Sequence, residues 1–142
     1  MKIREIMTNQ VIGIHPEESI SVAARRLQRY NIGILPVCES NGELCGLLTD
    51  RDIVVRCLAA GRPPENTRVR DVMTSKLIYA KPEMDVSAAA GLMGREQIRR
   101  LPVVENGRLC GMVGLGDIAR REQSAPDAVD ALADITSNIS NR

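Results

Sequence analysis

The segment 46–53, Gly-Leu-Leu-Thr-Asp-Arg-Asp-Ile, carries the residue types of this chain best suited to hold a polar ligand. Thr49 and Asp52 have the spacing of a capping box, in which a hydroxyl and a carboxylate satisfy the first N–H groups of a helix. The Thr49 hydroxyl and the Arg51 guanidinium also suit phosphate oxygens, and the Asp52 carboxylate can accept two hydroxyl hydrogen bonds from a ribose. A helix beginning here adds positive potential for an anion. The capping and ligand-binding interpretations are compatible.

The motif belongs to an internal repeat. Ile-Met-Thr at 6–8 recurs as Val-Met-Thr at 72–74, and Leu-Pro-Val at 35–37 recurs at 101–103, an offset of 66 residues. One residue is then missing from the turn at 105–107, and with an offset of 65 Asp52 corresponds to Asp117. A duplication of this length indicates two copies of one supersecondary unit, and the cleft between the copies is where we first expect a ligand.

The second copy departs from the motif, because it reads Gly-Leu-Gly-Asp at 114–117. The aspartate is kept as Asp117, but glycines replace both Thr49 and Arg51, so a hydroxyl and one cation are lost. We therefore predict that the Asp52 site is the stronger one and that the Asp117 site is weak, empty or differently selective. Asp117 could equally be a carboxylate that only begins a helix.

The elements that must position these residues follow the same order in both copies, β-α-β-β-α. Short apolar stretches at 11–14 and 77–80 end at prolines, and Ser19 and Asp85 are good N-caps for helices with apolar residues at helical spacing. Asn-Gly turns at 41–42 and 106–107 predict hairpins. In the first copy a final helix is predicted from about Asp50 to Ala60, ended by Gly61.

This order predicts an α+β fold of two pseudo-symmetric β-α-β-β-α repeats packed sheet to sheet, with small three-stranded sheets and helices on one face. The expected boundaries are 1–61 for repeat 1, 62–66 for a linker, 67–122 for repeat 2 and 123–142 for a C-terminal tail. The tail is predicted to form a weak helix after Ala125-Pro126. Its apolar positions could dock on the body or on another subunit: Val129, Leu132, Ala133 and Ile135.

Composition argues against nucleic-acid binding. Hydrophobic residues make up 44% and charged residues 26%, as in ordinary soluble proteins. The formal net charge is +1, from 19 basic and 18 acidic residues, which gives no basic excess for a phosphate backbone. The chain has two tyrosines and no phenylalanine or tryptophan, so the stacking surfaces typical of RNA binders are missing.

Metal binding and catalysis are not expected either. The four cysteines form no CxxC pair and there is one histidine, His15, whereas a zinc site needs clustered ligands. No nucleophile–base pair or P-loop is visible, so we expect no catalytic residues and no enzyme. Without a signal core or a run long enough to span a bilayer, we expect a cytoplasmic protein that does not enter membranes.

The doubled order of elements, the Leu-Pro-Val segments and Thr49-x-x-Asp52 resemble a pair of CBS domains, the tandem Bateman module, over residues 3–122. More narrowly the chain is similar to stand-alone bacterial CBS-pair proteins. The resemblance implies binding of an adenosine nucleotide (AMP, ADP or ATP), and sometimes S-adenosylmethionine or NAD, between the repeats, with no cofactor required. It also implies flat homodimers.

The resemblance further assigns roles by position. Asp52 would hold the ribose, Thr49 the ribose or phosphate, and Arg100, less surely Arg99, would reach phosphates. Adenine would lie among residues that map to Val11, Ile12, Ile34 and Pro36. The expected function is a non-catalytic energy or metabolite sensor that acts through a dimer or an unidentified protein partner. The alternative is a structural or protein-interaction module with a vestigial cleft.

Overall fold

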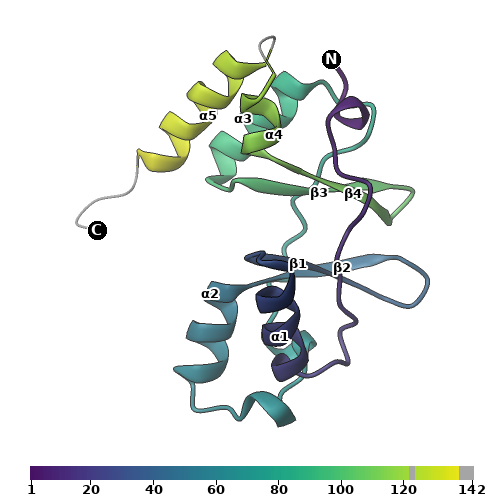
Figure 1. Cartoon of the computed structure of the whole chain (residues 1–142), viewed down its shortest axis with the longest axis vertical. Coiled ribbons are helices and arrows are strands. Elements are labelled where there is room, and N and C mark those ends of the chain that lie inside the picture. The colour runs from purple at the N-terminus through teal and green to yellow at the C-terminus, as the bar shows by residue number, and fades with distance from the viewer. Residues whose placement is uncertain (122–123, 138–142) are drawn as a thin grey trace. The chain divides into compact units, whose positions relative to one another are not determined.

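The computed structural model describes residues 1–121 and 124–137 (Figure 1). The end of predicted repeat 2 at residue 122 and the end of the predicted tail lie outside these ranges. The chain divides into two compact units, each with an antiparallel hairpin covered by helices. The principal elements are α1 (Ile20–Tyr30), β1 (Ile34–Cys38), β2 (Leu44–Thr49), α2 (Asp50–Asp52) continued by the π-helix η2 (Ile53–Leu58), α3 (Val86–Glu96), β3 (Arg100–Glu105), β4 (Arg108–Gly114), α4 (Leu115–Ala119) and α5 (Ala125–Thr136). Single turns of 3-10 helix lie at η1 (Ile3–Glu5), η3 (Pro64–Asn66) and η4 (Val69–Asp71).

The two long helices start where the sequence predicts, but only one start is capped by a side chain. The Ser19 hydroxyl accepts a hydrogen bond from the Val22 N–H at 3.2 Å. Asp85 occupies the N-cap position of α3 without accepting such a bond, because its carboxylate is paired with the Lys2 ammonium at 3.0 Å. That pairing is the leading cause of a lowered pKa for Asp85. Asp85 is therefore the N-cap residue that the sequence predicts, but its side chain makes no capping hydrogen bond.

Each sheet has two strands rather than the predicted three. β1 pairs antiparallel with β2, and β3 pairs with β4. The expected first strands each contribute one bridge, Ile14 beside Val37 and Ala80 beside Val103. Pro16 and Pro82 follow two residues later and have no N–H to continue a ladder, so the pairing stops there.

The hydrophobic cores join the leading segment of one repeat to the body of the other. One unit comprises residues 1–11, 78–106 and 110–142, and its core includes Ile3 and Ile6 beside Met93 and Leu101. The other comprises residues 12–77 and 107–109, and its core includes Val69 and Val72. Each unit therefore needs residues from both halves of the sequence.

Helix α5 docks on its unit through a face that includes one of the four apolar positions named from the sequence. Ala128, Ala131 and Ile135 are buried against the unit, whereas Val129 and Leu132 remain exposed. A Cβ on Gly94 of α3 would lie 3.4 Å from the Ala131 Cα, so small residues on both helices allow the close approach. Of the four positions expected to dock on the body or on another subunit, Ile135 is buried against the body and Ala133 is also exposed. Docking of the three exposed positions on another subunit stays a prediction. No helix in the described residues is long and apolar enough to cross a bilayer.

Candidate functional site

The residues around Asp52 form a closed polar cluster at the end of β2. The Asp52 N–H donates to the Thr49 hydroxyl and the Thr49 N–H donates to the Asp52 carboxylate, both at 3.0 Å. The predicted capping box is therefore confirmed. Asp52 is only 8% exposed, so its charge needs partners inside the protein.

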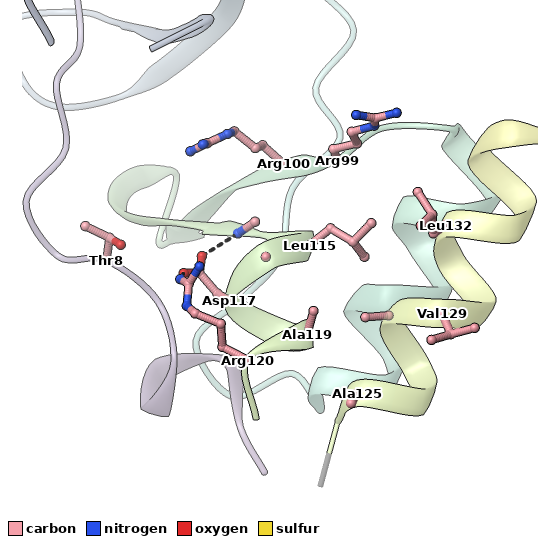
Figure 2. Close-up of a pocket in the computed structure, with 13 residues that line it drawn as sticks. Thr8, Arg99, Arg100, Leu115, Asp117, Ala119, Arg120, Ala125, Val129 and Leu132 are labelled. Atoms are coloured by element: carbon pink, nitrogen blue, oxygen red, sulfur yellow. Dashed lines mark hydrogen bonds and ion pairs between the residues drawn. The ribbon is translucent and has the colours of Figure 1, made fainter. Parts of the chain in front are cut away.

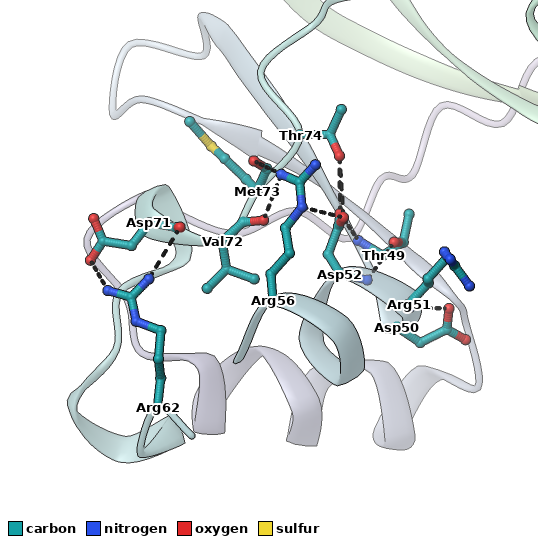
Figure 3. Close-up of polar contacts among 10 residues, drawn as sticks. All are labelled: Thr49, Asp50, Arg51, Asp52, Arg56, Arg62, Asp71, Val72, Met73 and Thr74. Carbon is teal, nitrogen blue, oxygen red and sulfur yellow. Dashed lines mark hydrogen bonds and ion pairs between the residues drawn. The ribbon is translucent and has the colours of Figure 1, made fainter. Parts of the chain in front are cut away.

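Two further residues supply those partners. The Thr74 hydroxyl lies 3.3 Å from both carboxylate oxygens of Asp52, and Arg56 Nε lies 3.8 Å from one of them. The Arg56 guanidinium also donates to the Met73 carbonyl at 3.2 Å, which ties it to the leading segment of the second repeat (Figure 3). Figure 3 shows the exposed Arg51 side chain turned away from the Asp52 carboxylate.

Asp117 occupies the equivalent position at the end of β4. Its carboxylate accepts the Gly114 N–H at 2.7 Å and pairs with the Arg120 guanidinium at 2.5 Å. The first contact matches that of Asp52 with the Thr49 N–H, so the backbone geometry of the motif survives without a hydroxyl. The Asp117 side chain is more exposed than that of Asp52, 21% against 11%.

A pocket of about 720 Å³ opens beside Asp117, within the range typical of small-molecule sites (Figure 2). Three arginines line it against one aspartate, which favours an anionic ligand. Its other side is formed by small and aliphatic side chains of α4 and α5. The lining residues are Thr8, Arg99, Arg100, Gly114, Leu115, Gly116, Asp117, Ala119, Arg120, Ala125, Ala128, Val129 and Leu132.

The predicted site residues fall into two groups, one in each unit. Arg100 and Asp117 line the pocket together, and the half-buried Val11 belongs to the same unit. The other group is Thr49, Arg51, Asp52, Ile12, Ile34 and Pro36. Within that group the Pro36 carbonyl accepts the Ile14 N–H at 3.0 Å, which holds the 12–14 segment along β1.

Sequence reasoning did not single out several residues of these clusters. Thr8 and Thr74 both follow a methionine in the repeated Met-Thr pair, and that recurrence was the available signal. Arg120 lies outside the repeated motif, yet it replaces the cation lost at Gly116. Arg56 carries no signal in the pattern, and the sequence indicates Val129 and Leu132 as docking positions but not as pocket residues.

Cys45 and Cys110 donate to the carbonyls of Val37 and Val103 at 3.3 Å, in equivalent contacts of the two repeats. Burial, with a contribution from nearby Cys45, raises the pKa of Cys38 to about 11. Among the described residues no group of three or more His, Cys, Asp or Glu side chains could hold a metal ion.

Two α+β units, each with an aspartate at a strand-to-helix junction, define a tandem-repeat module. The CBS domain model matches residues 3–58 and 69–124, so this chain belongs to the CBS domain family. It is 41% identical to the CBS domain-containing protein YhcV of Bacillus subtilis over 134 residues, 94% of either chain.

Solved structures agree in fold. Hypoxic Response Protein I with two coordinated zinc ions has a TM-score of 0.79 at 34% identity, covering 85% of this chain and 98% of that one. The CBS domain pair of MJ0100, in complex with 5′-methylthioadenosine and S-adenosyl-L-methionine, has a TM-score of 0.75 at 30% identity, covering 84% and 94%.

Proposed function

We propose that this protein is a non-catalytic regulatory module that binds an adenosine nucleotide, AMP, ADP or ATP, and acts as an energy or metabolite sensor. The observation that carries the proposal is the pocket beside Asp117. It combines a carboxylate for sugar hydroxyls, three arginines for phosphates and an apolar side for a base.

The chemistry of each part supports this ligand class. Asp117 can accept two hydroxyl hydrogen bonds from a ribose once Arg120 swings from the carboxylate to a phosphate. Arg99 and Arg100 are exposed at the start of β3 and can offer planar, paired donors to phosphate oxygens. The adenosyl ligands bound by the CBS pair of MJ0100 further support an adenosine compound.

The Asp52 cluster is proposed as a second ribose site. Its carboxylate is presently shared by Thr49, Thr74 and Arg56, so a ribose would have to replace the Thr74 hydroxyl or the Arg56 guanidinium. The sequence favours Asp52 as the stronger site and the pocket geometry favours Asp117. Separate variants of the two aspartates decide the ranking.

Isothermal titration of the full chain with AMP, ADP, ATP, S-adenosylmethionine and NAD tests the proposal, with inorganic phosphate and ribose 5-phosphate as partial ligands. We expect saturable binding of at least one adenosine compound and weaker binding of both partial ligands. Chromatography of the same mixtures should recover every ligand unchanged, as a non-catalytic role requires. Equal binding of all seven compounds, or of none, would contradict the proposal.

A homodimer is the proposed assembly through which binding is transmitted. Val54, Val55 and Leu58 form an exposed aliphatic patch on η2, with Val54 and Leu58 more than half exposed. In the other unit the corresponding helix α4 is packed against α5. The patch therefore also favours the alternative function, a protein-interaction module. Sedimentation of Val54→Asp/Leu58→Asp against wild type should show loss of the dimer.

A cytoplasmic location is proposed with this function. All four cysteines are free thiols, which suits a reducing compartment. Fractionation of cells that express a tagged full chain tests the location.

A further inference from the structure

We propose that helix α5 supplies the surface on which the nucleobase packs in the Asp117 pocket, through Val129 and Leu132. The inference rests on the proposed function and deepens it, because it assigns one end of the pocket to one part of the ligand. Helix α5 lies beyond both segments matched by the CBS domain model, the second of which ends at residue 124.

The position of α5 is fixed by its inner face. Ala128, Ala131 and Ile135 are buried, and the Ser124 hydroxyl just before the helix donates to the Ile118 carbonyl of α4 at 2.7 Å. Since Ser124 itself is buried, this bond anchors the start of α5 to α4. Side chains on the outer face are therefore held at a defined place beside the pocket.

Two aliphatic side chains on that outer face are exposed rather than buried in the hydrophobic core. Val129 is 66% exposed and Leu132 is 43% exposed, and residues three apart on a helix share one side. Both line the pocket, as Leu115 and Ala119 of α4 do. Together they give the pocket an aliphatic end. Contact with an apolar group of a ligand would remove this surface from water, which is favourable.

The pocket is chemically divided along its length. Figure 2 shows Thr8, Asp117 and Arg120 toward one end and Val129 and Leu132, on α5, toward the other. A ligand that spans both must pair a polar anionic part with an apolar part. A nucleoside phosphate has this form, whereas ribose 5-phosphate has only the polar half.

The aliphatic end also limits selectivity. Val129 and Leu132 have no side-chain hydrogen-bonding group, so their contacts favour a ligand with a base over one without. They discriminate poorly between purines that differ only in hydrogen-bonding edges. We therefore expect this surface to contribute equally to the binding of AMP and IMP.

The test titrates AMP, IMP and ribose 5-phosphate into the full-length Val129→Ser/Leu132→Ser variant. We expect AMP and IMP each to bind roughly 10-fold more weakly than to wild type, and ribose 5-phosphate to change less than about twofold. Ala133→Ser is the matched control, because Ala133 is exposed on α5 and does not line the pocket. It should change none of the three affinities.

The outcomes separate this inference from the proposed function. Wild type that binds no adenosine compound overturns both. If wild type binds AMP and the double variant binds it with an affinity within twofold, only the role of α5 is overturned. The same holds if the double variant loses as much affinity for ribose 5-phosphate as for AMP. Circular dichroism checks the helix in each variant. Should the double variant unfold, the near-isosteric Val129→Thr must still weaken AMP more than ribose 5-phosphate.

Discussion

The Thr74 hydroxyl lies 3.3 Å from both carboxylate oxygens of Asp52, so the leading segment of the second repeat completes the polar cluster of the first. The backbone of the same residue exchanges two hydrogen bonds with Leu47 of β2, at 2.8 and 2.9 Å. The equivalent Thr8 exchanges two such bonds with Met112 of β4 and lines the Asp117 pocket. The Met-Thr pair is therefore a structural part of both sites.

Replacing Asp117 with Ala should weaken binding of the preferred adenosine compound by roughly 10- to 100-fold, because lost hydrogen bonds to a charged acceptor cost about 1.5–3 kcal/mol. Calorimetric titration measures the change. Asp130→Ala is the control, since Asp130 is an exposed acid on α5 that does not line the pocket. Equal affinities in the two variants would remove Asp117 from the site.

Replacing Asp52 with Ala should weaken a second binding event over the same range and also destabilise the fold. The Thr49 N–H would lose its acceptor, and we expect the free energy of unfolding to fall by about 1–3 kcal/mol. Urea unfolding of Asp52→Ala and Asp52→Asn tests this, because the amide retains one acceptor oxygen. If the free energy of unfolding of Asp52→Asn is no higher than that of Asp52→Ala, the capping role of Asp52 is contradicted.

Gly111→Ala should lower the free energy of unfolding by about 1–3 kcal/mol through overpacking. An added Cβ would lie 2.9 Å from the Thr8 carbonyl oxygen and 2.9 Å from Met7 Sδ, and the backbone oxygen cannot yield cheaply. Gly91→Ala in α3 is the contrast. Its new Cβ meets only the end of the flexible Arg95 side chain, and Ala is favoured in a helix by up to about 1 kcal/mol.

Alkylation of Cys38 should be slow at pH 8 in the folded protein and should accelerate as pH rises toward 11. Burial is the leading reason its pKa is raised to about 11, so little thiolate exists near neutrality. Mass spectrometry after timed iodoacetamide pulses measures the rate at each pH. The urea-unfolded chain is the reference, and equal rates in the two states at pH 8 would contradict the raised pKa.

The pair Glu18–Arg26 should stabilise the fold at neutral pH and not in acid. Partial burial opposes ionisation of Glu18, but the His15 N–H and the Arg26 guanidinium outweigh it and lower the pKa. A lowered carboxyl pKa gives stability that is present above the unfolded value, near 4.5, and is lost as pH falls through the folded value. Glu18→Gln should cost up to about 1 kcal/mol at pH 7 and almost nothing at pH 3, in urea titrations at both.

The helices and hairpins could be predicted because their signals are local. Ser19, the Asn-Gly turns and the apolar spacing each depend on a few neighbouring residues, and α1, α3 and both hairpins appear where expected. The exchange of leading segments could not be predicted, since periodicity shows that Val69 and Val72 are buried and not which core receives them. The prediction of a third strand in each sheet is wrong, because the prolines that follow Ile14 and Ala80 allow only one bridge each.

The pocket beside Asp117 could not be predicted from the sequence either. Gly114 and Gly116 were interpreted as lost chemistry, but in the fold they leave space, and Arg120 supplies a cation from one turn further along. The sequence indicates Val129 and Leu132 as docking positions but not as pocket residues, because their exposure depends on which side of the helix docks. The ranking of the two aspartate sites stays a prediction.

The interleaving of the two repeats has a consequence for how such a chain can be divided. A fragment ending at residue 61 would keep β1 and β2 but lack Val69 and Val72, so its hydrophobic interior would be left open. Two separate chains of one repeat each would complete both cores only if the leading residues of each chain packed into the core of the other. When both copies belong to one polypeptide, each core is completed within a single chain, so its formation does not depend on protein concentration.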